Sequence, residues 1–120
     1  MDETRARDLV DRYFSALTRR DWSTVRTLLH DDLSFEGPLA TLDTADDYLQ
    51  GLEHVTARMT GAERRIVFAK GEDVLQIYEV SFDAPAVTAP VAEWLRFRDD
   101  RIAKIQMFLD TRPLSSAQPS

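Results

Sequence analysis

Apolar residues near the start of the chain recur at intervals of three and four, the spacing of an amphipathic helix. Over residues 3–19 this stripe consists of Ala6, Leu9, Val10, Tyr13, Phe14 and Leu17. Asp21 has the chemistry of an N-cap for a second helix, which we expect to end near residues 30–32. Thr44 opens a segment that resembles a capping box and predicts a third helix, ending at Gly61. The apolar side of that third helix would carry Tyr48, Leu52, Val55 and Met59.

Elsewhere the period changes to two, which is typical of strands with one buried face. Strands are expected at residues 33–36, 64–70 and 73–83 and as two long strands within 87–110, with a loop over residues 39–43. The last two strands meet at Asp99-Asp100, where a tight hairpin turn needs positive φ and usually contains Asn-Gly. Asp tolerates positive φ better than most residues, so we expect a hairpin.

One face of this hairpin is apolar except for a single carboxyl group. Glu93 alternates with Val91, Leu95 and Phe97 on the first strand. The facing side of the second strand is expected to present Ala103, Ile105, Met107 and Leu109. On the strand at 73–83, the face with Tyr78, Val80 and Phe82 is the more apolar one, which places Glu79 outside.

The order α-α-β-α-β-β-β-β does not suit a parallel βαβ design, because two helices are adjacent. It favours an α+β fold with helices packed on one face of a mostly antiparallel sheet. Such a sheet, if strongly curved, encloses a pocket between its concave face and the helices. The chain of 120 residues is long enough for one domain, expected over residues 1–110. Residues 111–120 lack a core pattern and are expected to fray.

The composition of the chain argues against several classes of function. Hydrophobic residues make up 43% and charged residues 30%, an ordinary globular mixture. A net charge of −6 without a basic stripe disfavours nucleic-acid binding. Cysteine is absent, the two histidines are far apart and the four glycines are scattered, so we expect no metal and no other cofactor. A charged N-terminus and the lack of a membrane-length apolar run predict a cytoplasmic protein that does not enter the membrane.

Glu93 and Tyr13 are the candidates for chemistry. An apolar wall would raise the pKa of the Glu93 carboxyl group and favour the neutral acid, which can donate a hydrogen bond. Tyr13 lies on the buried stripe of the first helix, so its hydroxyl needs a partner. Each has a structural alternative, because Glu93 could pair with an arginine and Tyr13 could be an ordinary core residue. A set that suits either a pocket lining or a plain core consists of Trp22, Phe35, Tyr48, Leu52, Tyr78, Phe82, Leu95 and Met107.

The segments RYFSALTRRDW, LLHDDLSFEGP and AEWLRFRDDRIAKIQMFLD, in this order of elements, resemble the nuclear transport factor two-like superfamily. The nearest pattern is its SnoaL-like and ketosteroid isomerase-like branch, which includes polyketide cyclases, and it covers about residues 5–110. The resemblance implies a cone-shaped, cystatin-like α+β barrel with a deep apolar pocket, often a homodimer packed through the outer sheet face. On that face this chain would expose Trp94, Gln106 and Phe108, an aromatic patch typical of an interface.

The resemblance also assigns roles to single residues. Ketosteroid isomerases use a tyrosine in an Arg-Tyr pair on the first helix, which Arg12-Tyr13 matches. They use an acidic hydrogen-bond donor ahead of an Arg-Phe pair, which Glu93 before Arg96-Phe97 matches. Their general base falls on Gly37, which has no side chain to act as one.

Two functions remain open. In the first, the protein is a cofactor-free isomerase, cyclase or lyase acting on a small, mostly apolar molecule, polycyclic ones included, through Tyr13 and Glu93. Its base would come from the substrate, from water or from an acid near the mouth such as Asp43 or Asp46. In the second, the same pocket binds a ligand without turnover, or the dimer serves as a scaffold. Gly37 favours the second function, whereas Glu93 favours the first.

Overall fold

The computed structural model describes residues 2–83 and 86–112 of the chain. In chain order its elements are α1 (Glu3–Thr18), α2 (Trp22–Thr27), β1 (Leu29–Glu36), β2 (Thr41–Leu42), α3 (Ala45–Thr56), β3 (Met59–Lys70), β4 (Asp73–Asp83), β5 (Ala86–Arg98) and β6 (Arg101–Leu109). The predicted α+β class and element order are confirmed, with short strand β2 added where a loop was expected. β2 forms because Thr41 and Leu42 pair with the end of β1. Of the tail expected to fray, residues 113–120 lie outside the described part of the chain.

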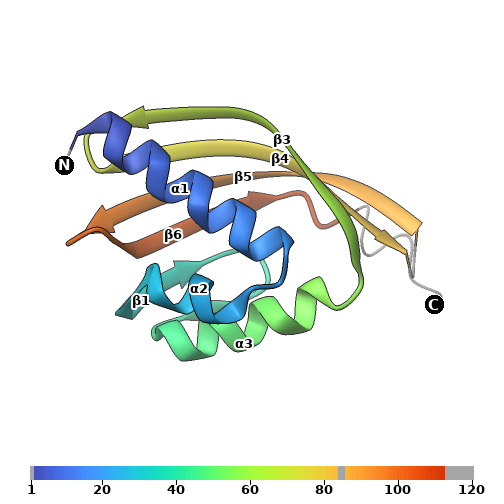
Figure 1. The fold of residues 1–120 in the computed structure, drawn as a ribbon. Helices are drawn as coiled ribbons and strands as arrows, with labels where there is room; N and C mark the ends of the chain where they lie inside the picture. The colour runs from blue at the N-terminus through green and yellow to red at the C-terminus, as the bar shows by residue number, and fades with distance from the viewer. Residues whose placement is uncertain (1, 84–85, 113–120) are drawn as a thin grey trace.

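The described strands form one curved sheet in the order β2-β1-β6-β5-β4-β3. Neighbouring strands are antiparallel except β1 and β6, which run parallel. The sheet bends around the helices, so α1 lies across the concave side of β3 and β4 while α3 packs on β1 (Figure 1). This arrangement turns one face of each long strand toward the helices and the other face outward.

Side-chain caps fix where the helices begin. Asp2 accepts a hydrogen bond from the backbone N–H of Arg5 at 2.8 Å, and Asp21 accepts one from Thr24 at 3.3 Å. Thr44 accepts one from Asp47 at 3.1 Å, so the predicted N-caps of the second and third helices are confirmed.

The predicted ends of two helices are wrong. α3 stops at Thr56, and both Met59 and Gly61 belong to β3. α2 stops at Thr27, and Leu29 already pairs with Ile102 of β6 in the parallel ladder. In both cases residues predicted to be helical form a strand because they pair with a strand distant in the sequence. The spacing of apolar residues within a segment cannot reveal such pairing.

The β5–β6 hairpin forms as predicted at Asp99-Asp100, whose φ values are 54° and 62°. A β-bulge in β6 changes the expected phase, because Arg96 pairs with Lys104 whereas Phe97 pairs with Ile102. Ala103 is the extra residue, so the prediction that it shares the inner face is wrong. Ile102 takes that place and is fully buried.

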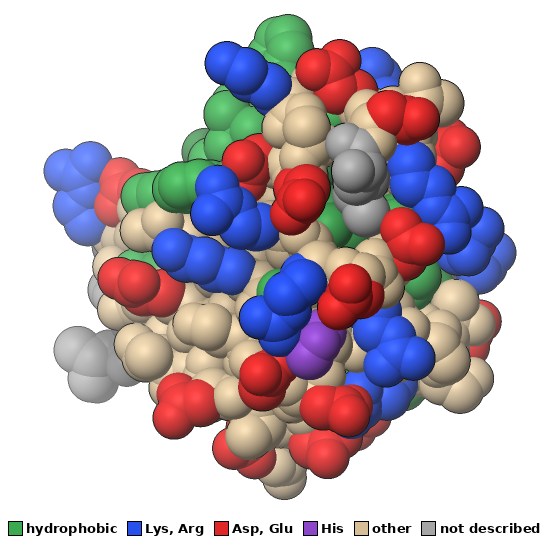
Figure 2. Space-filling model, turned by 90° about the vertical axis from the view of Figure 1, so that its left-hand side faces the viewer, with side chains coloured by type: hydrophobic (Ala, Val, Ile, Leu, Met, Phe, Trp, Pro, Cys, Tyr) green, Lys and Arg blue, Asp and Glu red, His purple; other side chains and the backbone are tan. Residues whose placement is uncertain are grey.

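The end of the molecule that carries these turns and the start of α1 is covered by acidic and basic side chains in alternation (Figure 2). Arg5 bonds to Asp100 at 3.2 Å, and Arg98 bonds to Asp32 at 2.9 Å. Because both signs are interspersed, this end does not form a basic patch of the kind that binds phosphate backbones.

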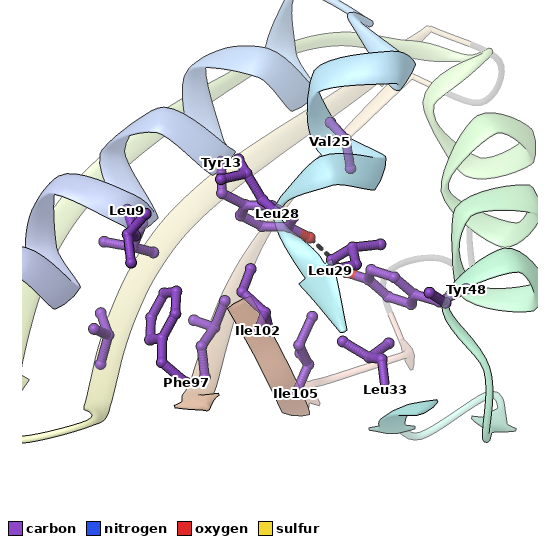
Figure 3. Close-up of a cluster of buried hydrophobic side chains, with 14 of the residues drawn as sticks. Leu9, Tyr13, Val25, Leu28, Leu29, Leu33, Tyr48, Phe97, Ile102 and Ile105 are labelled. Atoms are coloured by element: carbon purple, nitrogen blue, oxygen red, sulfur yellow. Dashed lines mark hydrogen bonds between the residues drawn. The ribbon is translucent and has the colours of Figure 1, made fainter. Parts of the chain in front are cut away.

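The core fills the space between the concave face and the helices (Figure 3). Its fully buried side chains include Leu29, Leu33, Leu95, Phe97, Ile102 and Ile105. On the outer face, by contrast, Leu75 and Ile77 are exposed, which confirms the predicted phase of β4 with Glu79 outside. Among the described residues, no helix combines the length and apolar character that crossing a membrane requires.

Candidate functional site

Glu93 lies in the middle of β5 on the face that points toward the helices. Its side chain is 2% exposed, and its neighbours on that face, Val91 and Leu95, are buried as well. Burial removes the carboxylate from water and raises the pKa of Glu93 above its ordinary value. Hydrogen bonds from Gln76 and Tyr78 oppose this rise without cancelling it. The alternation in the sequence therefore located a buried carboxyl group whose pKa is raised.

Gln76 is the partner of Glu93 on the neighbouring strand. The two residues sit directly opposite one another on β4 and β5, and Gln76 Nε2 donates to Glu93 Oε1 at 3.0 Å. Gln76 is fully buried. Sequence analysis missed this residue, although it alternates with Val74 and Tyr78, which is the same signal that singled out Glu93.

Tyr13 and Tyr48 bring their hydroxyl groups together from α1 and α3. The two oxygens lie 2.6 Å apart in a buried hydrogen bond (Figure 3). Burial raises the pKa of both phenols, and the nearby Glu93 carboxyl raises it further. Tyr13 thus has a partner other than Glu93, and Tyr48 is the residue that links it to the rest of the site.

The residues expected to line a pocket lie on the concave side or on the helices that cover it. Phe35, Tyr48 and Leu95 are buried, and the Phe35 and Tyr48 rings are 5.0 Å apart. Trp22, Leu52 and Met107 are partly buried and pack against the same core. Tyr78 and Phe82 are half-buried and follow Gln76 on the inner face of β4. Apolar side chains from several elements thus surround the polar group of Glu93, Gln76 and the tyrosines.

A groove of about 430 Å³ opens where β1 ends and β6 continues past it. Its lining residues are Glu36, Gly37, Pro38, Gln106, Met107, Phe108 and Leu109. Met107 sits directly opposite Glu93 in the β5–β6 ladder, so it belongs both to the groove and to the row that contains the carboxyl group. Of the residues expected to line a pocket, Met107 is the one that borders this groove.

Gly37 lines this groove, and it is the position at which the family resemblance led us to look for a general base. A Cβ atom there would lie 2.9 Å from Phe35 Cζ, closer than a Cβ atom normally comes to another carbon atom. An acidic side chain at this position would require Phe35 to move. The absence of a base at this position is thus coupled to how Phe35 packs.

A further polar cluster flanks Tyr78 and was not anticipated from the sequence. Arg64 of β3 pairs with Tyr78 in the sheet and forms an ion pair with Asp11 of α1, with 2.7 Å between Nη2 and Oδ1. The Arg64 guanidinium lies 5.3 Å from the Phe14 ring centre, and Phe14 meets Tyr78 edge-on at 5.6 Å. These contacts hold α1 against β3 and β4 beside the site.

Within residues 2–83 and 86–112, no three His, Asp or Glu side chains are grouped closely enough to hold a metal ion. One buried carboxyl group, one amide and several phenols can donate or accept hydrogen bonds to a ligand that carries oxygen.

Comparison with known proteins places these features in a family. Residues 10–105 match the SnoaL-like domain. A protein of solved structure from Kribbella flavida is 25% identical, with a TM-score of 0.85 over 92% of this chain and 90% of its own. A candidate ketosteroid isomerase from the same organism is 18% identical, with a TM-score of 0.79 over 91% of this chain and 80% of its own.

A candidate SnoaL-like polyketide cyclase from Shewanella putrefaciens is 19% identical, with a TM-score of 0.78 over 93% of this chain and 84% of its own. No curated protein matches the sequence. The predicted nuclear transport factor two-like fold is confirmed. Because differently named proteins share this fold, the activity has to be argued from the site.

Proposed function

This chain belongs to the SnoaL-like domain family, and on that premise we propose that it binds a small, mostly apolar molecule at Glu93. The neutral carboxyl group of Glu93 donates a hydrogen bond to an oxygen atom of that molecule. Supporting this, Glu93 is 2% exposed, and its hydrogen-bonding neighbours among the described residues, Gln76 and Tyr78, are both uncharged. A buried carboxyl group without a cationic partner keeps its proton more readily than an exposed one.

The reaction that suits this group is acid-catalysed isomerisation, cyclisation or dehydration. The Glu93 proton moves to a carbonyl or hydroxyl oxygen of the ligand, and the carboxylate that remains takes a proton back when the product forms. The transfer leaves a negative charge on the Glu93 carboxylate, which a preorganised hydrogen-bond donor stabilises. Tyr78, which hydrogen-bonds to Glu93, is placed to share that charge.

The groove at the sheet edge gives the ligand a route to this carboxyl group. Met107 stands between the groove and Glu93, and its flexible thioether side chain can change rotamer at low cost. Gly37 also lines this groove and contributes no side chain to it. A ligand that enters here reaches Glu93 without crossing the helices.

Binding without turnover is the second candidate, and Gly37 is the observation that favours it. The isomerase base position carries no acid, and Phe35 occupies the space that a side chain there would need. Asp46, one of the acids considered as a substitute base, is engaged by Arg26 at 3.0 Å. Measuring turnover on a ligand that binds would separate the two candidates.

The proposal is tested by titrating 2-naphthol, an apolar bicyclic molecule with one oxygen, and following its fluorescence. We expect Glu93→Ala to weaken binding by about 1–3 kcal/mol, because the ligand oxygen loses its donor. Glu93→Gln should retain much of the affinity, since an amide also donates. Glu79→Ala, the same change on the outer face of β4, serves as the matched control and should bind as the wild type does. Equal affinity in the wild type and Glu93→Ala would contradict the proposal.

We also infer that a second copy of the chain covers the outer sheet face. Apolar side chains stay exposed there: Phe68 by 61%, Phe108 by 50% and Leu75 by 44%. Together with Trp94 they border a groove of about 340 Å³. Asp73 in this groove already binds Arg96 of the same chain, and Lys104 lies 5.4 Å from the centre of the Trp94 ring. The exposed apolar side chains are therefore what a two-fold related copy would cover.

Phe108→Asp should convert a dimer at micromolar concentration into a monomer, because a charge would be buried without a partner. Sedimentation velocity measures this change. Leu39→Asp is the matched control, since Leu39 is 75% exposed and lies outside the sheet. A wild-type protein that sediments as a monomer would remove the inference.

A further inference from the structure

Gln76 has one half of its amide group without a partner. Its Nε2 atom donates to Glu93, whereas its Oε1 atom is buried and has no hydrogen-bond partner among the described residues. The whole side chain is 0% exposed, in the middle of the sheet between β3 and β5. Buried polar atoms are almost always hydrogen-bonded, so an unpaired acceptor in this position requires an explanation.

The orientation of the amide follows from its neighbour. Nε2 can donate to Glu93 whether the carboxyl group is neutral or ionised. The reversed amide would bring its oxygen against a carboxylate oxygen whenever Glu93 loses its proton. Nε2 therefore takes the position on Glu93, and Oε1 remains the free acceptor. An apolar residue of similar size, such as methionine, would fill the same space without leaving an acceptor unsatisfied.

We propose that Gln76 determines ligand specificity: its Oε1 accepts a hydrogen bond from a hydroxyl, phenol or enol group and so selects such ligands over ketones and ethers. This inference rests on the proposed binding of a ligand oxygen at Glu93. Gln76 and Glu93 lie directly opposite each other on neighbouring strands, so one oxygen atom can approach both. That oxygen accepts from the Glu93 carboxyl group and donates its own hydrogen to Gln76.

A ketone or ether oxygen can satisfy Glu93 only, because it has no hydrogen to give. It leaves Gln76 Oε1 unpaired and cut off from water, whereas a hydroxyl or enol satisfies both residues. The substrate class is therefore a mostly apolar molecule that is hydroxylated, or that becomes an enol, at the atom held by Glu93. Enolisation or loss of a hydroxyl group fits this pairing.

A matched pair of probes tests the inference on the unaltered protein. 2-Naphthol carries a hydroxyl hydrogen, and 2-methoxynaphthalene has the same ring system without one. We expect the wild-type protein to bind 2-naphthol about tenfold more tightly, the size of effect that one buried hydrogen bond produces. Fluorescence titration or calorimetry gives both dissociation constants. A ratio near one overturns the inference.

A preference for 2-naphthol could also arise because the methyl group of 2-methoxynaphthalene is too bulky for the site. The Gln76→Met variant distinguishes this cause from the hydrogen bond. In this variant the ratio of the two dissociation constants should fall to about one, because 2-naphthol binds more weakly while 2-methoxynaphthalene binds as before. Gln50→Met, the same change on the exposed face of α3, is the control and should keep the wild-type ratio. A preference that persists in Gln76→Met comes from methyl bulk and overturns the inference.

The outcomes also separate this inference from the proposed function. If both probes bind equally and Glu93→Ala weakens both, Gln76 does not set specificity and the site at Glu93 stands. If neither probe binds, or if Glu93→Ala leaves both affinities unchanged, the site itself is wrong and the inference falls with it.

Discussion

The free energy of unfolding of the wild-type protein, relative to that of Glu93→Gln, is expected to fall as the pH rises from about 4.5 toward neutrality. Burial raises the pKa of Glu93 in the folded state above its unfolded value. Below the unfolded value, both states hold the proton and the wild type has its full stability. Above it, the unfolded chain releases the proton first, so stability is lost until the pH passes the folded pKa.

The slope of this difference reaches at most about 1.4 kcal/mol per pH unit for one group. Comparison with Glu93→Gln is needed because other carboxyl groups act in the opposite direction. Hydrogen bonds from Arg96 and Arg26 lower the pKa values of Asp73 and Asp31, so these residues favour the folded state as pH rises. Their contribution cancels in the difference, which chemical denaturation at several pH values supplies.

Glu79→Gln is the matched control, and its difference from the wild type should lack the loss described for Glu93. A difference between wild type and Glu93→Gln that stays constant from pH 4 to 8 would mean that the Glu93 carboxyl behaves as a solvated group. The argument for a neutral acid at this position would then be lost.

Tyr13→Phe is expected to lower the free energy of unfolding by about 1–3 kcal/mol. The variant removes one hydroxyl of the 2.6 Å pair and leaves the other, on Tyr48, buried without its partner. Tyr48→Phe should cost a similar amount for the same reason. Urea unfolding monitored by tryptophan fluorescence measures both changes.

The double variant Tyr13→Phe/Tyr48→Phe should be clearly less destabilised than the sum of the two single variants. Once both hydroxyl groups are gone, no polar atom of the pair remains unsatisfied. Additive effects would show that the two hydroxyls do not depend on one another. In that case the pair would not connect α1 and α3 across the site.

Local sequence patterns were sufficient to predict the architecture. The three- and four-residue spacing around Tyr13 and the alternation around Glu93 each place their residue on the concave side, where the structure finds it buried. The turn at Asp99-Asp100 also follows from local chemistry, because both residues adopt positive φ. These features depend on a few consecutive residues, and a period or a turn preference describes them fully.

Features that depend on strand register could not be predicted from the sequence. The bulge at Ala103 exists because β5 and β6 change register beside Phe97, and nothing in the order of residues marks that point. The same limit applies to the site, since Gln76 becomes the partner of Glu93 through strand pairing across 17 residues of chain. Alternation could identify a polar residue on each inner face, but not that the two meet.

The most direct test of the account is the titration of the Glu93 carboxyl group itself. Carbon-13 NMR of protein labelled at the glutamate side-chain carboxyl carbons follows each group with pH, and Glu93→Gln assigns the signal. We predict that Glu93 titrates above the exposed glutamates and that its signal shifts when 2-naphthol is added. A Glu93 signal that titrates together with the exposed glutamates and does not respond to 2-naphthol would contradict the account.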